Sequence, residues 1–303
     1  MAIEQLERAA IGRPINRAGV SLFPVYLPSG EGDGGIDIAA KADDVVISEQ
    51  GSARVPTITV TNPGLRPVLL VEGETVTGGQ QNRVINVSVL VPAGATVNVP
   101  VSCVEAGRWG GTSGFARGRT FAPRRVRRVK NASVAESIRQ GGFKTSDQGA
   151  VWNTIDFELN RLNVDSSTRA IHATEALFDV DQTIAQAATD LVRRGPLPGQ
   201  CGVVISHGRR IVSAEIFATP ELLSANWEAL VRATLLDLPA APEGRPSAGR
   251  ALWFLHQLAT TKTTDSPGVG LGREQHVRTR HFIGQALTLN GAVVHASAFA
   301  IAA

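Results

Sequence analysis

Two short segments concentrate the side chains that could bind a ligand or carry out chemistry. They are "GGQQNRVIN", which begins at Gly78, and "SCVEAGRW", which begins at Ser102. A guanidinium group can hold phosphate, an indole ring can stack on a base, and amides can position hydroxyl or carbonyl groups. The candidate ligand-binding residues are Gln81, Asn82, Arg83, Asn86, Arg108 and Trp109. Their mixture of donors, acceptors and a flat ring predicts a site for a phosphorylated, nucleotide-type small molecule.

The candidate catalytic residues lie in the second of these segments or just before the first. Glu105 is the first candidate for acid/base work, because carboxylates commonly serve that role. Glu72 and Glu74 lie on one face of the preceding strand by its period of two. Cys103 is a nucleophile only if a neighbouring positive charge lowers its pKa, and a cysteine on a valine face is otherwise core. The alternative for the whole cluster is a set of polar groups that satisfy one another at the rim of a sheet.

Alternating valines predict how the two segments meet. Val87, Val89 and Val91 alternate with other residues, as do Val97, Val99 and Val101 after the turn "PAGAT". If both sets face one core, a hairpin that pairs Val91 with Val97 also places Ile85 opposite Cys103. This register places Arg83 opposite Glu105 as an ion pair. Gly78 and Gly79 are expected to permit a tight turn or the close approach of a ligand to the backbone.

The elements that would position this cluster change along the chain. Short β-branched runs recur about every ten residues up to residue 110, which predicts an antiparallel β-sandwich or a barrel-like sheet. Residues 111–132 are rich in Arg and Gly and are predicted to form a loop. Residues 133–303 combine helical periodicity with β-hairpins, one turning at Asn290-Gly291. The fold class is therefore α+β, with the parts 1–110 and 133–303 expected to pack as one compact unit.

Composition narrows the class of protein. The chain has 303 residues, 43% of them hydrophobic, and a net charge of +3. No apolar run approaches ~18 residues, and the N-terminus lacks a secretory pattern, so we expect a cytoplasmic protein with no membrane partner. Cys103 and Cys201 are too sparse for a disulfide framework or a cysteine-based zinc site.

The basic charge is concentrated in one window. No acidic residue lies between Glu105 and Glu136, whereas the window holds eight Arg and Lys residues. Such a segment can attract nucleic acid, with Phe115 and Phe121 as stacking rings, or it can be a solvated loop.

The remaining polar motifs are less specific. None of the six histidines has a spacing typical of metal ligation, so no metal site is predicted, and no cofactor is indicated. Glu215 and His295 lie on predicted hairpin strands, where they could line a pocket or be buried without function.

The two motifs resemble those of the ARPP-1 family, the ARG and Rhodanese-Phosphatase-superfamily-associated Protein domain. The matching residues are Glu72, Gly73, Glu74, Gly78, Gly79, Gln81, Asn82, Arg83 and Asn86, followed by Cys103, Glu105, Gly107, Arg108 and Trp109. The segments "GVVISHGRRIVSAEIFATPELLSANWEALV" and "GQALTLNGAVVHASAFAI" also resemble the family, so the similarity spans nearly the whole chain. The resemblance implies a strand-rich fold and a role connected with NAD-derived or ADP-ribose-type metabolites.

Three functional hypotheses follow. The first is an enzyme, or a degenerate enzyme, that acts on an ADP-ribose-type nucleotide, with phosphate held by Arg83 and Arg108 and a base stacked on Trp109. The second is a non-catalytic module that senses such a nucleotide or docks on a partner through the same rim. The third is nucleic-acid binding through the basic segment.

Overall fold

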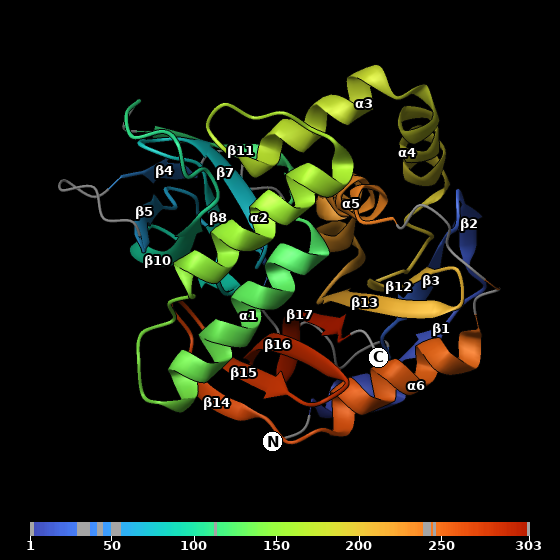
Figure 1. Ribbon diagram of the computed structural model, residues 1–303. Helices are drawn as coiled ribbons and strands as arrows, with labels where there is room; N and C mark the ends of the chain where they lie inside the picture. The colour runs from blue at the N-terminus through green and yellow to red at the C-terminus, as the bar shows by residue number, and fades with distance from the viewer. Residues whose placement is uncertain are drawn as a thin grey trace. The chain divides into compact units, whose positions relative to one another are not determined.

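A computed structural model describes residues 3–28, 37–40, 45–49, 56–111, 114–238, 244 and 247–301, and Figure 1 shows its elements. The chain divides into two compact units. One comprises Met1–Ile36, Asp181–Pro267 and Gly272–Ala303, and the other comprises Asp37–Val180 with Gly268–Leu271. These units do not follow the predicted parts 1–110 and 133–303, because the N-terminal strand β3 pairs with β12 of the later part of the chain. Among the described helices, none combines the length and the hydropathy that a membrane-spanning segment requires.

The unit that contains both ends of the chain is built on one antiparallel sheet with the order β1-β3-β12-β13-β17-β16-β15-β14, and β2 pairs with β3. Its strands are β1 (Ala10–Ile11), β2 (Ile15–Arg17), β3 (Val20–Tyr26), β12 (Gly202–His207), β13 (Arg210–Phe217), β14 (Thr264–Pro267), β15 (Arg273–Arg278), β16 (Phe282–Leu289) and β17 (Ala292–Ala300). Its helices are η1 (Glu4–Arg8), α4 (Gln182–Arg194), α5 (Pro220–Leu236) and α6 (Ala248–Thr260). Apolar residues of α6 and η1 pack on one sheet face to form its core. The predicted hairpin turn at Asn290-Gly291 joins β16 to β17, with positive φ at both residues.

The second unit contains a closed antiparallel barrel with the order β10-β5-β4-β11-β7-β8. Its strands are β4 (Val46–Ser48), β5 (Thr57–Thr61), β7 (Glu74–Gly78), β8 (Arg83–Ile85), β10 (Thr96–Cys103) and β11 (Gly114–Phe121), and β6 (Val68–Leu70) pairs with β9 (Val89–Val91). Its helices are α1 (Arg124–Arg139), α2 (Gln148–Leu162), η2 (Ile171–Ala176) and α3 (Leu177–Val180). Branched aliphatic side chains fill the barrel core. The prediction of an α+β protein with a barrel-like N-terminal sheet and a C-terminal half of helices and hairpins is confirmed.

The prediction of a loop at 111–132 is wrong. Strand β11 and the first two turns of α1 occupy most of this range. The inner face of α1 includes Val126, Arg127, Lys130 and Val134, which recur at helical spacing, but two of the four are cationic. A search for apolar periodicity therefore misses the helix, because its buried face is completed by carboxylates from elsewhere in the chain.

The predicted register between β8 and β10 is wrong by two residues, although odd-numbered residues lie opposite odd-numbered residues as predicted. Strand β8 pairs with β10 so that Arg83 lies opposite Cys103 and Ile85 lies opposite Val101. The shift of two residues keeps odd positions paired with odd positions and the same faces inward. It arises because β9 and β10 do not form a hairpin: Val91 pairs with Val68 of β6, and Val97 pairs with Val60 of β5.

Candidate functional site

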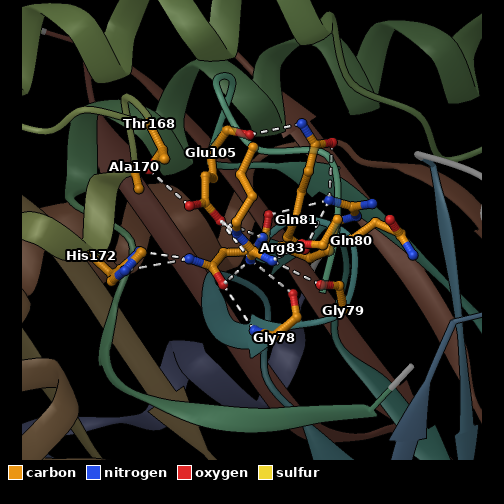
Figure 2. A network of polar contacts seen from close by, with 12 residues as sticks. Gly78, Gly79, Gln80, Gln81, Arg83, Glu105, Thr168, Ala170 and His172 are labelled. Atoms are coloured by element: carbon orange, nitrogen blue, oxygen red, sulfur yellow. Dashed lines mark hydrogen bonds and ion pairs between the residues drawn. The ribbon is translucent and has the colours of Figure 1, made fainter. Parts of the chain in front are cut away.

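The turn between β7 and β8 forms the centre of the predicted site. Gly78 and Gly79 have φ values of 120° and 53°, in the region that favours glycine. A Cβ atom on Gly79 would lie 2.2 Å from the ring of Phe115 and 2.6 Å from Oε1 of Glu49. The close approach that the glycines permit is therefore made by the protein's own side chains at this turn, shown with its neighbours in Figure 2.

Arg108 fixes this turn to the second motif. Its guanidinium donates to the carbonyl oxygens of Gly78, Gly79 and Gly110 at 3.1, 2.9 and 2.7 Å. It also donates to Oδ1 of Asn82 at 3.2 Å and forms an ion pair with Glu105 at 2.7 Å. Every nitrogen of this guanidinium thus has a protein acceptor, so Arg108 holds the site together rather than facing a ligand.

The carboxylate of Glu105 accepts hydrogen bonds from three residues. It accepts from Nε of Arg108 at 2.9 Å, from Oγ1 of Thr168 at 2.8 Å and from the backbone N–H of Asn82 at 3.2 Å. Burial raises the pKa of Glu105, but the hydrogen bonds from Arg108, Thr168 and Asn82 outweigh burial and leave the pKa below its ordinary value. The expected ion pair with Arg83 is replaced by the pair with Arg108, three residues along the chain. A carboxylate so fully engaged serves as an anchor more readily than as a base.

Arg83 has the least satisfied charge of the cluster. Its side chain is fully buried, and its Nη1 donates to the carbonyl oxygen of Gln81 at 2.9 Å. Glu49, the residue after β4, lies 3.6 Å from Nη2 as an ion pair. Within the described part of the chain, Nε and Nη2 of Arg83 and Oε2 of Glu49 have no hydrogen-bond partner. Ile85 and Ile47, which face the barrel core, share the strand faces of Arg83 and Glu49, so these two charges lie at one mouth of the barrel.

Gln81 and Asn86 make mainly internal contacts. Nε2 of Gln81 donates to the carbonyl oxygen of Glu105 at 2.9 Å. Asn86 accepts from Ser102 at 2.6 Å and donates to the carbonyl oxygen of Lys144 at 3.0 Å. Both side chains are buried and stabilise the ends of strands.

Cys103 lies in the protein interior. Burial raises the pKa of its thiol above the ordinary value, although a hydrogen bond to the carbonyl oxygen of Glu105 and the charge of Arg83 act in the opposite direction. A protonated, buried thiol is a poor nucleophile, so these surroundings favour a structural role.

Glu72 and Glu74 form ion pairs with the basic segment. Glu72 contacts Nη2 of Arg127 at 2.7 Å and Nζ of Lys130 at 2.9 Å, and all three groups are buried. Burial raises the pKa of Glu72, but the charges of Arg127 and Lys130 lower it to about 2. Glu74 forms an ion pair with Arg117 and accepts from the backbone N–H of Val71. Glu72 compensates two buried cations and Glu74 pairs with a partly exposed arginine, so neither carboxylate is free for acid/base chemistry.

Trp109 differs from its neighbours because it faces solvent. Its side chain is 62% exposed, next in sequence to the anchored Arg108. An indole ring held on a fixed turn provides an open stacking surface.

Two residues of this cluster, His172 and Thr168, could not be predicted from any local sequence motif. The half-buried His172 of η2 lies beside Asn82, with 2.7 Å between its Nδ1 and the Asn82 amide nitrogen. Thr168 precedes it on the same segment and donates to Glu105, and Figure 2 shows both residues. An isolated bridge between Glu105 and Ala170 brings this segment to the site. The contact joins residues ninety positions apart, so only the folded chain reveals it.

The other unit contains two buried His–Glu pairs. Nε2 of His295 lies 3.2 Å from Glu215, and Nε2 of His276 lies 3.1 Å from Glu274. Glu215 and His295 therefore meet as a pair on adjacent strands. Among the described residues, no group of three or more His, Cys, Asp or Glu residues is placed to hold a metal ion.

The chain matches the model of a known protein family. The model of a family described as the ARG and Rhodanese-Phosphatase-superfamily-associated Protein domain, ARPP-1, matches residues 8–299. Comparisons with curated proteins and with solved structures gave no match.

Proposed function

The chain belongs to the ARPP-1 family, and from that premise we propose that it binds a phosphorylated, nucleotide-type small molecule of the ADP-ribose or NAD-derived class. The binding site is the barrel mouth around Arg83, with the neighbouring surface of Trp109. We propose binding rather than hydrolysis as the activity, and the cytoplasm as its location.

The observation that carries the proposal is the buried guanidinium of Arg83. Its Nε and Nη2 together form the edge of the arginine fork that binds two oxygens of a phosphate or a carboxylate at once. In the described structure this edge donates no hydrogen bond, although buried donors are nearly always satisfied. Glu49 balances the charge at 3.6 Å but does not satisfy the donors. Two phosphate oxygens would satisfy them.

Access to this edge is through the turn above it. Oε1 of Glu49 accepts from the backbone N–H of Gln80 at 2.9 Å, which closes the mouth beside Arg83. Gly78 and Gln80 are half-buried, so we propose that a ligand reaches the guanidinium through this turn. We propose that the ligand's phosphate displaces Glu49 from Arg83.

Trp109 completes the proposed site. Base–aromatic stacking contributes about 1–3 kcal/mol per base and requires an open ring face. Trp109 has such a face, and Arg108 ties its backbone to the turn that covers Arg83. A ligand with both a phosphate and a base can use both residues.

The carboxylates favour binding over hydrolysis. Glu72, Glu74 and Glu105 are each engaged by at least one cation of the protein. Nucleic-acid binding gains no similar support, because five of the eight basic side chains of the 105–136 window are paired with glutamates.

The test compares ligands and arginine variants by thermal shift. ADP-ribose, NAD and AMP are measured against adenosine, which has the base but lacks phosphate. We expect a concentration-dependent rise in Tm with the phosphorylated ligands, because a ligand that binds only the folded state stabilises it. Arg83→Met should weaken binding about tenfold to a hundredfold, the range for hydrogen bonds to a charged group.

The matched control is Arg119→Met, which removes an exposed arginine of β11. Arg83→Lys keeps the charge and removes the fork, so it serves if Arg83→Met does not fold. Unchanged Tm across the ligand panel, or equal affinity in Arg83→Lys and the parent protein, contradicts the proposal.

A further inference from the structure

The orientation of the Asn82 amide is determined by two donors that cannot become acceptors. Its Oδ1 lies 2.9 Å from the backbone nitrogen of Gly78 and 3.2 Å from Nη2 of Arg108. A backbone N–H and a guanidinium only donate, so the atom that faces them must be the amide oxygen. The NH₂ group of Asn82 must then face the opposite way, towards His172.

This orientation determines the tautomer of His172. The Asn82 amide nitrogen lies 2.7 Å from Nδ1 of the ring and 3.5 Å from Nε2, so Nδ1 is the principal acceptor. An NH₂ group has no lone pair to offer, and a hydrogen on Nδ1 would face a hydrogen of the amide. Nδ1 must therefore be unprotonated, which leaves the hydrogen on Nε2.

We propose that His172 is a neutral hydrogen-bond donor of the ligand site, through Nε2–H, with its tautomer set by Asn82. This inference rests on the proposed function for the identity of the ligand, but not for the tautomer. The ring is half-buried, and among the described residues the Asn82 amide is the only hydrogen-bond partner found for it. Nε2 is thus the ring nitrogen left for a ligand.

The chemistry of this donor differs from that of Arg83. A neutral N–H can donate to a ribose hydroxyl or a carbonyl oxygen, which carry no charge for a cation to balance, whereas the cationic guanidinium is matched to phosphate. The same geometry argues against His172 as a general base, because its unprotonated nitrogen is occupied by Asn82. The pair therefore adds recognition of the uncharged part of the ligand.

The tautomer is tested in the protein without ligand by long-range ¹H–¹⁵N NMR of ¹⁵N-labelled histidine. His172→Gln identifies the signals of this ring, because they disappear from its spectrum. We expect the Nε2–H tautomer near neutral pH. In Asn82→Asp a carboxylate oxygen faces Nδ1, so the hydrogen should move to Nδ1. An Nδ1–H tautomer, or a doubly protonated ring, in the parent protein overturns the inference.

Recognition is tested with ADP-ribose by calorimetry. His172→Phe removes the donor and should weaken binding about fivefold, the value of one neutral hydrogen bond. His172→Gln retains an N–H donor and should bind more tightly than His172→Phe. Equal affinity of the two variants overturns the role in recognition. If the parent protein binds no nucleotide, the proposed function fails in that form, whereas the NMR result still decides the assignment of the donor.

Discussion

Replacement of Glu72 by Gln should destabilise the barrel unit more than any other single exchange of a glutamate for glutamine in this region. Glu72 is fully buried and is the shared ion-pair partner of Arg127 and Lys130, which are also buried. Glutamine preserves the shape of the side chain but removes its charge. Two cations would then remain in the interior without the carboxylate that they share, although Lys130 would keep neutral acceptors such as the carbonyl oxygen of Asn86.

The magnitude follows from the pKa of Glu72. It is lowered from 4.5 to about 2 in the folded protein. This difference corresponds to about 3 kcal/mol of stability at neutral pH, at ~1.4 kcal/mol per pH unit. Loss of one partner from a buried ion pair costs about 3–5 kcal/mol, which agrees with that estimate.

The sign of the pH dependence is fixed by the same value. Because the folded pKa is lowered, the contribution is fully present above 4.5 and is lost as the pH falls towards about 2. Protonated Glu72 resembles glutamine in charge. The stability difference between the parent protein and Glu72→Gln should therefore shrink through this range.

Urea unfolding followed by circular dichroism measures the difference. The matched control is Glu136→Gln, which breaks an exposed pair with Arg139 on the same helix, α1, and should leave the midpoint unchanged. Equal midpoints for the parent protein and Glu72→Gln at neutral pH would refute the assignment of Glu72 as the compensating charge. A difference that stays constant as the pH falls below 4.5 would refute the pKa argument.

Three other predictions concern the same unit. Cys103 should resist alkylation by iodoacetamide at neutral pH until the protein is unfolded, because burial raises the pKa of its thiol; rapid labelling of the folded protein would contradict this. Gly79→Ala should cost about 1–3 kcal/mol more than Gly94→Ala in thermal unfolding, because a Cβ at Gly79 meets Phe115 whereas one at Gly94 meets no atom within 4 Å. Labelled single-stranded DNA should show no saturable binding at physiological salt in fluorescence polarisation, since most charges of the basic window are paired; saturable binding that weakens steeply with salt would restore the nucleic-acid hypothesis.

Local pattern was enough for the outline of the fold. Alternating valines predict strands because successive side chains in a strand point to opposite faces. The same alternation determines the parity of the pairing between β8 and β10, since a slip of one residue would turn the buried face outward. It does not distinguish a slip of two, which preserves the faces. That slip placed Arg83 opposite Cys103 rather than Glu105.

In the basic window between Glu105 and Glu136, by contrast, local pattern was not enough to predict the structure. From the sequence alone, Arg127 and Lys130 look like solvated charges, because isolated buried cations are costly. In the folded protein both positions face inward on α1, where Glu72 compensates them. That carboxylate lies on another element, so no local pattern could reveal that the window contains a buried helix face.

The sequence by itself determined the fold class, the alternating faces of the strands and the two motifs that form the polar cluster. Only the tertiary structure decided which arginine of the two motifs has all its hydrogen-bond donors satisfied by the protein and which has unsatisfied donors. Arg108 and Arg83 have the same chemistry, yet carbonyl groups of the turn surround the first, whereas the second faces Glu49 across 3.6 Å. Hydrogen bonding depends on distances between residues far apart in the chain, and only the folded barrel sets those distances.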